Sequence, residues 1–188
     1  GSVKKSAPAD DSSEDEDKIV QLTIPEGWRT EEIADELDKL GHKPGGKAFL
    51  DAVKNYPSDR FDFLKDRPNE ESLEGYLYPD TYNIRLNEPP EDIIQKLLQN
   101  FDDKFSKDMR DRAEQMGLSI NEVLIFASLV EREVVYGPER PIVADVYLSR
   151  WEQGWRLDAD PTVQYAIASA NPPTRMRRMA SRSAGAGA

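Results

Sequence analysis

Two hydrophobic periodicities predict the first folded part of the chain. Apolar and polar residues alternate over 20–24, which is typical of a short strand, and a Pro-Glu-Gly turn follows. Apolar residues then recur at helical spacing over 30–40, with Thr30 as the expected N-cap and Gly41 as the residue that stops the helix. A second short helix is predicted over 48–53, so this part should form a small module.

The chain beyond this module is predicted to be mostly helical. A polar connecting segment over 59–71 leads into the tyrosine-rich stretch 72–86, which indicates extended chain interrupted by a Pro-Asp pair. Helical periodicity follows over 90–101, 106–116 and 139–152. The fold class predicted from these patterns is α+β: a small module followed by a mostly helical domain with a few strands.

The most apolar helix lies between the last two of these segments. Ser119 is its expected N-cap, and Glu122, three residues later, completes a capping box. Its run VLIFASLV, residues 123–130, is apolar on every side of a helix. We therefore expect this helix to be central in its domain.

Both ends of the chain differ in composition from the part between them. Residues 1–17 contain a single valine and no aromatic residue, so they cannot bury enough apolar surface to fold, and a disordered acidic linker is predicted. Residues 171–188 abruptly lack acids and large aliphatic residues, which predicts a disordered or non-native tail.

Composition narrows the chemistry that the chain can perform. There is no cysteine, so disulfides, thiol nucleophiles and thiolate metal sites are excluded, and the one histidine, His42, follows a glycine at a helix end where a surface position is expected. The formal net charge of −11 argues against binding nucleic acid, whose phosphates would be repelled. No stretch approaches the roughly 20 apolar residues that span a bilayer. Any general acid or general base in this chain is therefore expected to be an aspartate or a glutamate.

The first candidate is Glu131, in the sequence ASLVEREV that ends the apolar helix. Its carboxyl lies one turn beyond Ala127 and Ser128, on a face that is otherwise apolar. Desolvation there would raise the pKa of Glu131, as a general acid working near neutral pH requires. The alternative is that Glu131 begins the solvated end of the helix and pairs with Arg132, Arg140 or a neighbouring lysine. Spacing alone favours this alternative, since carboxylates are ordinarily exposed.

The second candidate is the segment LEGYLYPDTY, residues 73–82. Glu74 and Asp80 are interleaved with three tyrosines here, and aromatic faces next to carboxylates suit a sugar-binding cleft. The alternative is a strand and turn whose tyrosines are core residues.

The third candidate is GWRLDADPTVQYA, residues 154–166. Asp158 and Asp160 could bind a metal ion, but two acids without further ligands favour an ordinary turn, so no metal site is predicted.

These segments, in this order, carry a family resemblance. EGYLYPDTY, FASLVERE, ERPIVADVYLSR and GWRLDADPTVQYA together resemble the YceG-like endolytic murein transglycosylases of bacteria, over roughly residues 19–168. The resemblance implies that Glu131 is the catalytic glutamate. It also implies a LysM-like module over 18–58 and a transglycosylase catalytic domain over 59–170. Substrate-binding roles are implied, from motif position, for a further set: Glu74, Tyr82, Ser128, Asp160, Thr162 and Tyr165.

The resemblance further implies a reaction and a setting. The reaction is non-hydrolytic cleavage of the β-1,4 bond between N-acetylmuramic acid and N-acetylglucosamine in nascent peptidoglycan strands, giving 1,6-anhydro ends and needing no metal or cofactor. Cell-wall synthases are implied as partners. A single N-terminal membrane anchor is implied, with this part of the protein on the outer face of the bacterial membrane. The anchor and the family's cleft-closing segments after Tyr165 do not occur here, so we expect a domain truncated at both ends.

Two other functions stay open from the sequence. A lysozyme-like hydrolase would need a second carboxylate, Glu74 or Asp160, about 5–9.5 Å from Glu131. A non-catalytic peptidoglycan-binding or scaffold protein would need no catalytic carboxylate at all.

Overall fold

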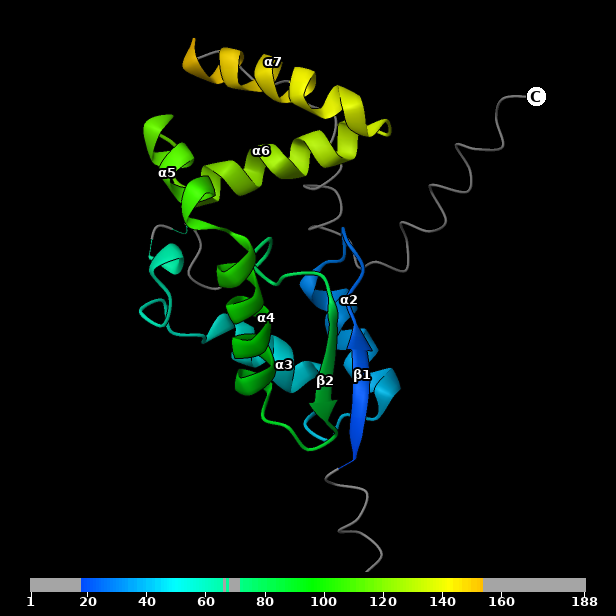
Figure 1. Cartoon of the computed structure of the whole chain (residues 1–188). Helices are drawn as coiled ribbons and strands as arrows, with labels where there is room; N and C mark the ends of the chain where they lie inside the picture. Colours follow the sequence, from blue (N-terminus) through cyan, green and yellow to red (C-terminus); the bar gives the residue numbers. More distant parts are fainter. Residues whose placement is uncertain (1–17, 66, 68–71, 154–188) are drawn as a thin grey trace, which may run out of the picture. The chain divides into compact units, whose positions relative to one another are not determined.

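The computed structural model describes residues 18–65, 67 and 72–153, and the chain divides into two compact units between Lys107 and Asp108 (Figure 1). Unit 1 contains β1 (Ile19–Thr23), α2 (Thr30–Leu40), α3 (Gly45–Lys54), the 3-10 helix η1 (Asp62–Leu64), β2 (Thr81–Arg85) and α4 (Pro90–Lys104). The remaining elements are α5 (Lys107–Gln115), α6 (Ile120–Glu133), the 3-10 helix η2 (Gly137–Glu139) and α7 (Arg140–Glu152). This is the mostly helical α+β composition predicted from the sequence.

The sheet of unit 1 consists of β1 and β2, which pair antiparallel with Ile19 opposite Arg85 (Figure 1). The backbone bonds that flank this pairing run from Ile24 N to the Asp80 carbonyl, 2.8 Å, and from Leu86 N to the Lys18 carbonyl, 3.0 Å. In an antiparallel pair, hydrogen-bonded and non-hydrogen-bonded positions alternate. The even-numbered residues therefore bond across the sheet, and the odd-numbered residues turn their N–H and C=O groups to its two outer edges.

The outer edges of the sheet differ. At the β2 edge, the Asp80 carboxylate accepts from Thr81 N at 2.8 Å, Lys96 Nζ donates to the Asn83 carbonyl at 3.1 Å, and the Glu88 carboxylate accepts from Arg85 N at 3.0 Å. At the β1 edge, the outward backbone groups of residues 19, 21 and 23 bond to nothing within the described ranges. Side chains thus cover much of one edge and leave the other open.

The core of unit 1 lies between the inner face of the sheet and its helices. Leu22 of β1, Ile84 of β2 and Leu37 of α2 are fully buried. Helices α2 and α3 approach each other so closely that a Cβ on Gly46 would lie 2.4 Å from the Ala34 carbonyl oxygen. Only a glycine fits at this crossing without displacing the backbone.

The segment predicted as a polar connection, 59–71, contributes to this core where it is described. Phe63 and Leu64 of η1 are buried, and the Phe63 ring lies 4.8 Å from that of Phe101 on α4 and 5.8 Å from that of Tyr76. The prediction was wrong here because three apolar residues, Phe61, Phe63 and Leu64, among many charged residues form no visible period. The burial of Phe63 and Leu64 depends on rings supplied from elsewhere in the chain.

The structure also divides the chain at a different place from the boundary predicted after residue 58. Because β1 pairs with β2, the strand that opens the predicted module and the strand over 81–85 share one sheet and one compact unit. A pairing between distant segments leaves no local pattern in the sequence from which it could be read.

The helix ends agree with the local signals except at one residue. Gly41 ends α2 in the left-handed conformation, with φ of 78°, as predicted. The N-cap of α2 is Arg29 rather than Thr30, which is instead the first helical residue. At α6 the predicted capping box is confirmed, since Ser119 Oγ accepts from Glu122 N at 3.2 Å and the Glu122 carboxylate accepts from Ser119 N at 2.8 Å.

Unit 2 is organised around the packing of α6 on α7. Its buried cluster consists of Phe126, Leu129, Val130, Val134 and Tyr147. The opposite side of α6 is open within the described part of the chain, where Ile125 is 44% exposed. Among the described residues, α6 is therefore buried on the side that faces α7, and its central place in the domain stays a prediction.

Candidate functional site

The structure describes four of the seven predicted site residues, and these four are divided between the two units. Glu74 and Tyr82 belong to unit 1, and Ser128 and Glu131 belong to α6 of unit 2. The other three, Asp160, Thr162 and Tyr165, lie outside the described residues.

Glu131 lies two residues before the end of α6, and its side chain is exposed. Because Glu131 is exposed, the desolvated setting is not found, and among the described residues its carboxylate forms no hydrogen bond or ion pair, with Arg132 and Arg140 or otherwise. The helix turns Phe126, Leu129 and Val130 toward α7, and within the described ranges the side that carries Glu131 is exposed. The result is a carboxyl group near the end of a helix that no partner among the described residues engages.

Ser128 lies one turn before Glu131 on the same exposed side of α6. Its hydroxyl donates to the Ile125 carbonyl at 2.7 Å, a bond within the helix. The hydroxyl oxygen keeps its acceptor capacity, so Ser128 could still receive a hydrogen bond from a ligand beside Glu131.

Glu74 is committed to a contact inside unit 1. Its Oε2 accepts from the hydroxyl of Thr30 at 2.7 Å and from Thr30 N at 3.2 Å, across 44 positions of sequence. A carboxylate at the first turn of a helix is stabilised by the free N–H groups and the helix dipole. Glu74 thus anchors the start of α2, a contact that sequence analysis did not foresee because nothing local marks it.

Tyr82 belongs to a small hydrogen-bonded cluster with Asp80 and Asn100. The Tyr82 hydroxyl donates to the Tyr78 carbonyl at 2.7 Å and accepts from Asn100 Nδ2 at 2.9 Å, while Nδ2 also donates to Asp80 at 3.0 Å. Burial raises the pKa of Tyr82. The pKa of Asp80 is lowered, first by the hydrogen bond from Thr81 N and then by the one from Asn100.

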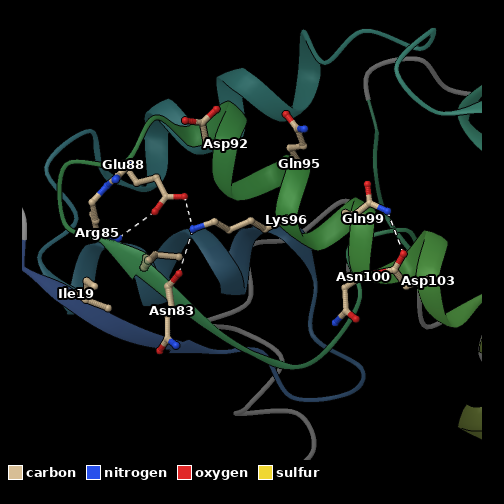
Figure 2. A pocket seen from close by; sticks show the side chains of 11 residues that line it. Ile19, Asn83, Arg85, Glu88, Asp92, Gln95, Lys96, Gln99, Asn100 and Asp103 are labelled. Carbon is tan, nitrogen blue, oxygen red and sulfur yellow. Dashed lines mark hydrogen bonds and ion pairs between the residues drawn. The ribbon is translucent and has the colours of Figure 1, made fainter.

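A groove that sequence analysis missed runs between β2 and α4 (Figure 2). Its volume is about 730 Å³. Figure 2 shows Lys96 reaching from α4 to the Glu88 carboxylate and the Asn83 carbonyl, so this side chain bridges the helix and the strand edge. The groove was missed because its wall combines one face of a helix with the edge of a strand.

His42 lies beneath the same region. It is buried, and its Nε2 is 2.7 Å from the Glu88 carbonyl oxygen. The prediction of a surface histidine was wrong, because the left-handed turn at Gly41 directs the chain back toward the unit, where Lys43 N donates to the Leu86 carbonyl at 2.7 Å.

Among the described residues, no group of three or more histidine, cysteine or acidic side chains is arranged to hold a metal ion. None of the helices in the described ranges combines the length and hydropathy that crossing a bilayer demands.

The fold and site describe a class of protein: a mostly helical α+β chain with a small antiparallel sheet and a solvent-facing glutamate on an apolar helix. The model of the YceG-like family matches residues 6–184, and the chain belongs to this family.

Relatives with curated names agree with this assignment. The chain is 30% identical over 167 residues to the endolytic murein transglycosylase of Streptococcus pneumoniae and 27% identical over 158 residues to that of Bacillus subtilis. These matches cover 79% and 78% of this chain, but only 29% and 43% of the relatives. The chain therefore spans less than half the length of either relative.

A solved structure shares the fold. The crystal structure of a yceG-like protein from Listeria monocytogenes superimposes with a TM-score of 0.64 at 28% sequence identity. The match covers 79% of this chain and 52% of the Listeria chain.

Proposed function

We propose that this chain is part of a lytic transglycosylase that cleaves the β-1,4 bond between N-acetylmuramic acid and N-acetylglucosamine within peptidoglycan strands. The family membership and the names of the relatives support murein as the substrate class. The observation that carries the proposal is Glu131: an exposed carboxylate on α6, in the motif ASLVERE, with no partner among the described residues.

In the proposed mechanism one carboxyl group does the proton transfer in both directions. Protonated Glu131 donates its proton to the glycosidic oxygen as the bond to the muramyl anomeric carbon breaks. The resulting carboxylate then takes the proton of the muramyl C6 hydroxyl as that oxygen bonds to the same carbon, which gives the 1,6-anhydro ring and restores the acid. Because the nucleophile belongs to the substrate, no second carboxylate is needed, in contrast to most glycosidases.

The contacts of the other candidates refine their proposed roles. Ser128, one turn from Glu131, is suited to orient a sugar hydroxyl or N-acetyl group. Asp160, Thr162 and Tyr165 keep the substrate-orienting roles that their motif implies. Since Glu74 bonds to Thr30 and Tyr82 bonds to Tyr78 and Asn100, their proposed contribution is to hold unit 1 in shape.

The setting of the reaction forms part of the same proposal. Peptidoglycan lies outside the bacterial cytoplasmic membrane, so we place this part of the protein on the outer face, with a membrane anchor preceding it. A LysM-like character of residues 18–58 and an association with cell-wall synthases are proposed on family resemblance alone.

The decisive experiment is mass spectrometry of purified glycan strands digested by the chain and by Glu131→Gln. We expect 1,6-anhydro ends from the wild type and a loss of about 10²- to 10⁴-fold in their rate of formation in the variant, the range attributed to a general acid or base. Glu133→Gln is the matched control, since Glu133 is also exposed and lies on the same helix two positions away.

Each other outcome rejects the proposal in a different way. Reducing ends in place of anhydro ends would indicate a lysozyme-like hydrolase. Strand binding without turnover, unchanged by Glu131→Gln, would indicate a non-catalytic binding protein. Equal losses in Glu131→Gln and Glu133→Gln would remove the special role of Glu131.

A further inference from the structure

The groove between β2 and α4 forms an extended trough that carries polar side chains along its walls. From α4 it is lined by a stripe of exposed polar residues at helical spacing: Asp92, Gln95, Gln99 and Asp103. These positions share one face of the helix, opposite its buried apolar face, and extend over about 16 Å at 1.5 Å per residue. The facing wall is the β2 edge, where Asn83 lies (Figure 2).

The hydrogen-bonding groups of this trough are largely unused. Within the described ranges, the side chains of Asn83, Asp92 and Gln95 form no hydrogen bond. Gln99 donates to Asp103 at 3.0 Å, which leaves its carbonyl oxygen and one carboxylate oxygen of Asp103 available. The trough therefore offers amide donors, amide acceptors and carboxylate acceptors in a row.

The base of the trough is held in place from below. Lys96 pairs with Glu88, whose side chain is only 3% exposed, and also donates to the Asn83 carbonyl. Asn100, further along α4, is fixed by bonds to Asp80 and Tyr82. Because these side chains are already ordered, binding a ligand there would cost little conformational entropy, which favours binding.

The charges of the trough favour a neutral ligand. Its acids are Glu88, Asp92 and Asp103, and its bases are Arg85 and Lys96. The Glu88 and Lys96 charges neutralise each other, which leaves a net charge near −1 spread over the length of the groove. Neither a strongly anionic nor a strongly cationic partner gains much from such a balance.

We propose that this groove binds a saccharide strand, as a second glycan contact separate from Glu131. Amides and carboxylates in a row match the hydroxyl and acetamido groups of N-acetylated sugars, and Ile19, 66% exposed at the rim, offers an apolar surface to a ring's C–H face. The choice of a saccharide rests on the proposed function, and the groove itself rests on the geometry of unit 1.

The test measures binding, not turnover. The β-1,4-linked tetramer of N-acetylglucosamine is titrated into the whole chain by calorimetry, and the site is mapped by backbone amide shifts in NMR spectra. We expect binding, with shifts on α4 and β2, and an affinity loss of tenfold or more in the double variant Gln95→Ala/Gln99→Ala, which removes two amides. Gln21→Ala, at an exposed glutamine of the same unit outside the groove, should bind as the wild type does.

Several results would overturn the inference. These are no binding of the tetramer, shifts confined to residues outside the groove, or equal affinity in the double variant and the wild type. Binding of a basic peptide such as tetralysine in the groove, with none of the tetramer, would show a peptide site instead. Thermal unfolding of the double variant at the wild-type midpoint excludes misfolding as the cause of a loss.

The outcomes also separate this inference from the proposed function. Glu131→Gln should leave tetramer binding at the groove unchanged. If the wild type forms no anhydro ends but the double variant loses binding, the transglycosylase proposal fails and the groove stands. If anhydro ends form and the tetramer does not bind on α4 and β2, the groove inference fails alone.

Discussion

At the scale of single residues, a hydrogen-bonding side chain from a distant part of the chain affects the pKa values of Asp80 and Tyr82. Asn100 on α4 donates to both Asp80 and Tyr82, which flank the start of β2. Because the pKa of Asp80 is lowered in the folded state, its contribution to stability is present above the ordinary pKa of an aspartate. That contribution is lost as the pH falls through the lowered value.

Asn100→Ala tests this account of Asp80. Removing the amide should move the pKa of Asp80 part of the way back toward its ordinary value, since the larger effect, the bond from Thr81 N, remains. The measurement is a pH titration of the Asp80 carboxyl carbon by NMR. Gln99→Ala is the control, because its amide bonds to Asp103 and not to Asp80; an unmoved titration in Asn100→Ala would contradict the account.

Residues whose roles depend on near neighbours were predictable. Gly41 and the Ser119–Glu122 capping box were identified from the sequence because their partners lie within one helical turn. The Glu74–Thr30 bond and the burial of His42 were not predictable, since both depend on segments more than 40 positions away.

At the scale of elements, the approach of α2 to α3 depends on Gly46. Gly46→Ala should destabilise the protein by about 1–3 kcal/mol, the usual cost of forcing an extra group into a packed contact, because the new Cβ meets the Ala34 backbone. Chemical denaturation measures the loss. Gly137→Ala is the matched control, with nothing within 4 Å of its added Cβ, and equal effects at both glycines would refute the packing argument.

Hydrophobic periodicity predicted the individual helices and strands, but it did not predict how they pack together. The strand at β1 and the helices α2, α3, α4, α5, α6 and α7 were each expected within a few residues of where they lie. The β1–β2 pairing and the burial of η1 were missed because they arise from contacts between segments far apart in sequence. The groove beside α4 was missed for the same reason.

At the scale of the whole molecule, acidic charge dominates. A net charge of −11 places many like charges close together, and this repulsion opposes the compact state. Raising sodium chloride from about 10 to about 150 mM shortens the screening length from about 30 to about 8 Å. We expect the thermal unfolding midpoint to rise over this range.

The salt experiment has a clear contrary result. A midpoint that falls with added salt would mean that ion pairs such as Lys39–Glu36 stabilise the protein more than the general repulsion destabilises it. Sucrose at equal osmolality is the control, since it changes solvent exclusion without screening charge.

The unequal edges of the small sheet have a practical meaning for protein engineering. An added strand, such as a reporter fragment or a designed hairpin, could pair with the backbone groups of β1 that have no partner among the described residues. Beside β2, the same strand would first have to displace the side chains of Asp80, Lys96 and Glu88. The sheet therefore has one direction in which it can be extended. A lysine at position 21, in the middle of the open edge, would be the simplest way to close it.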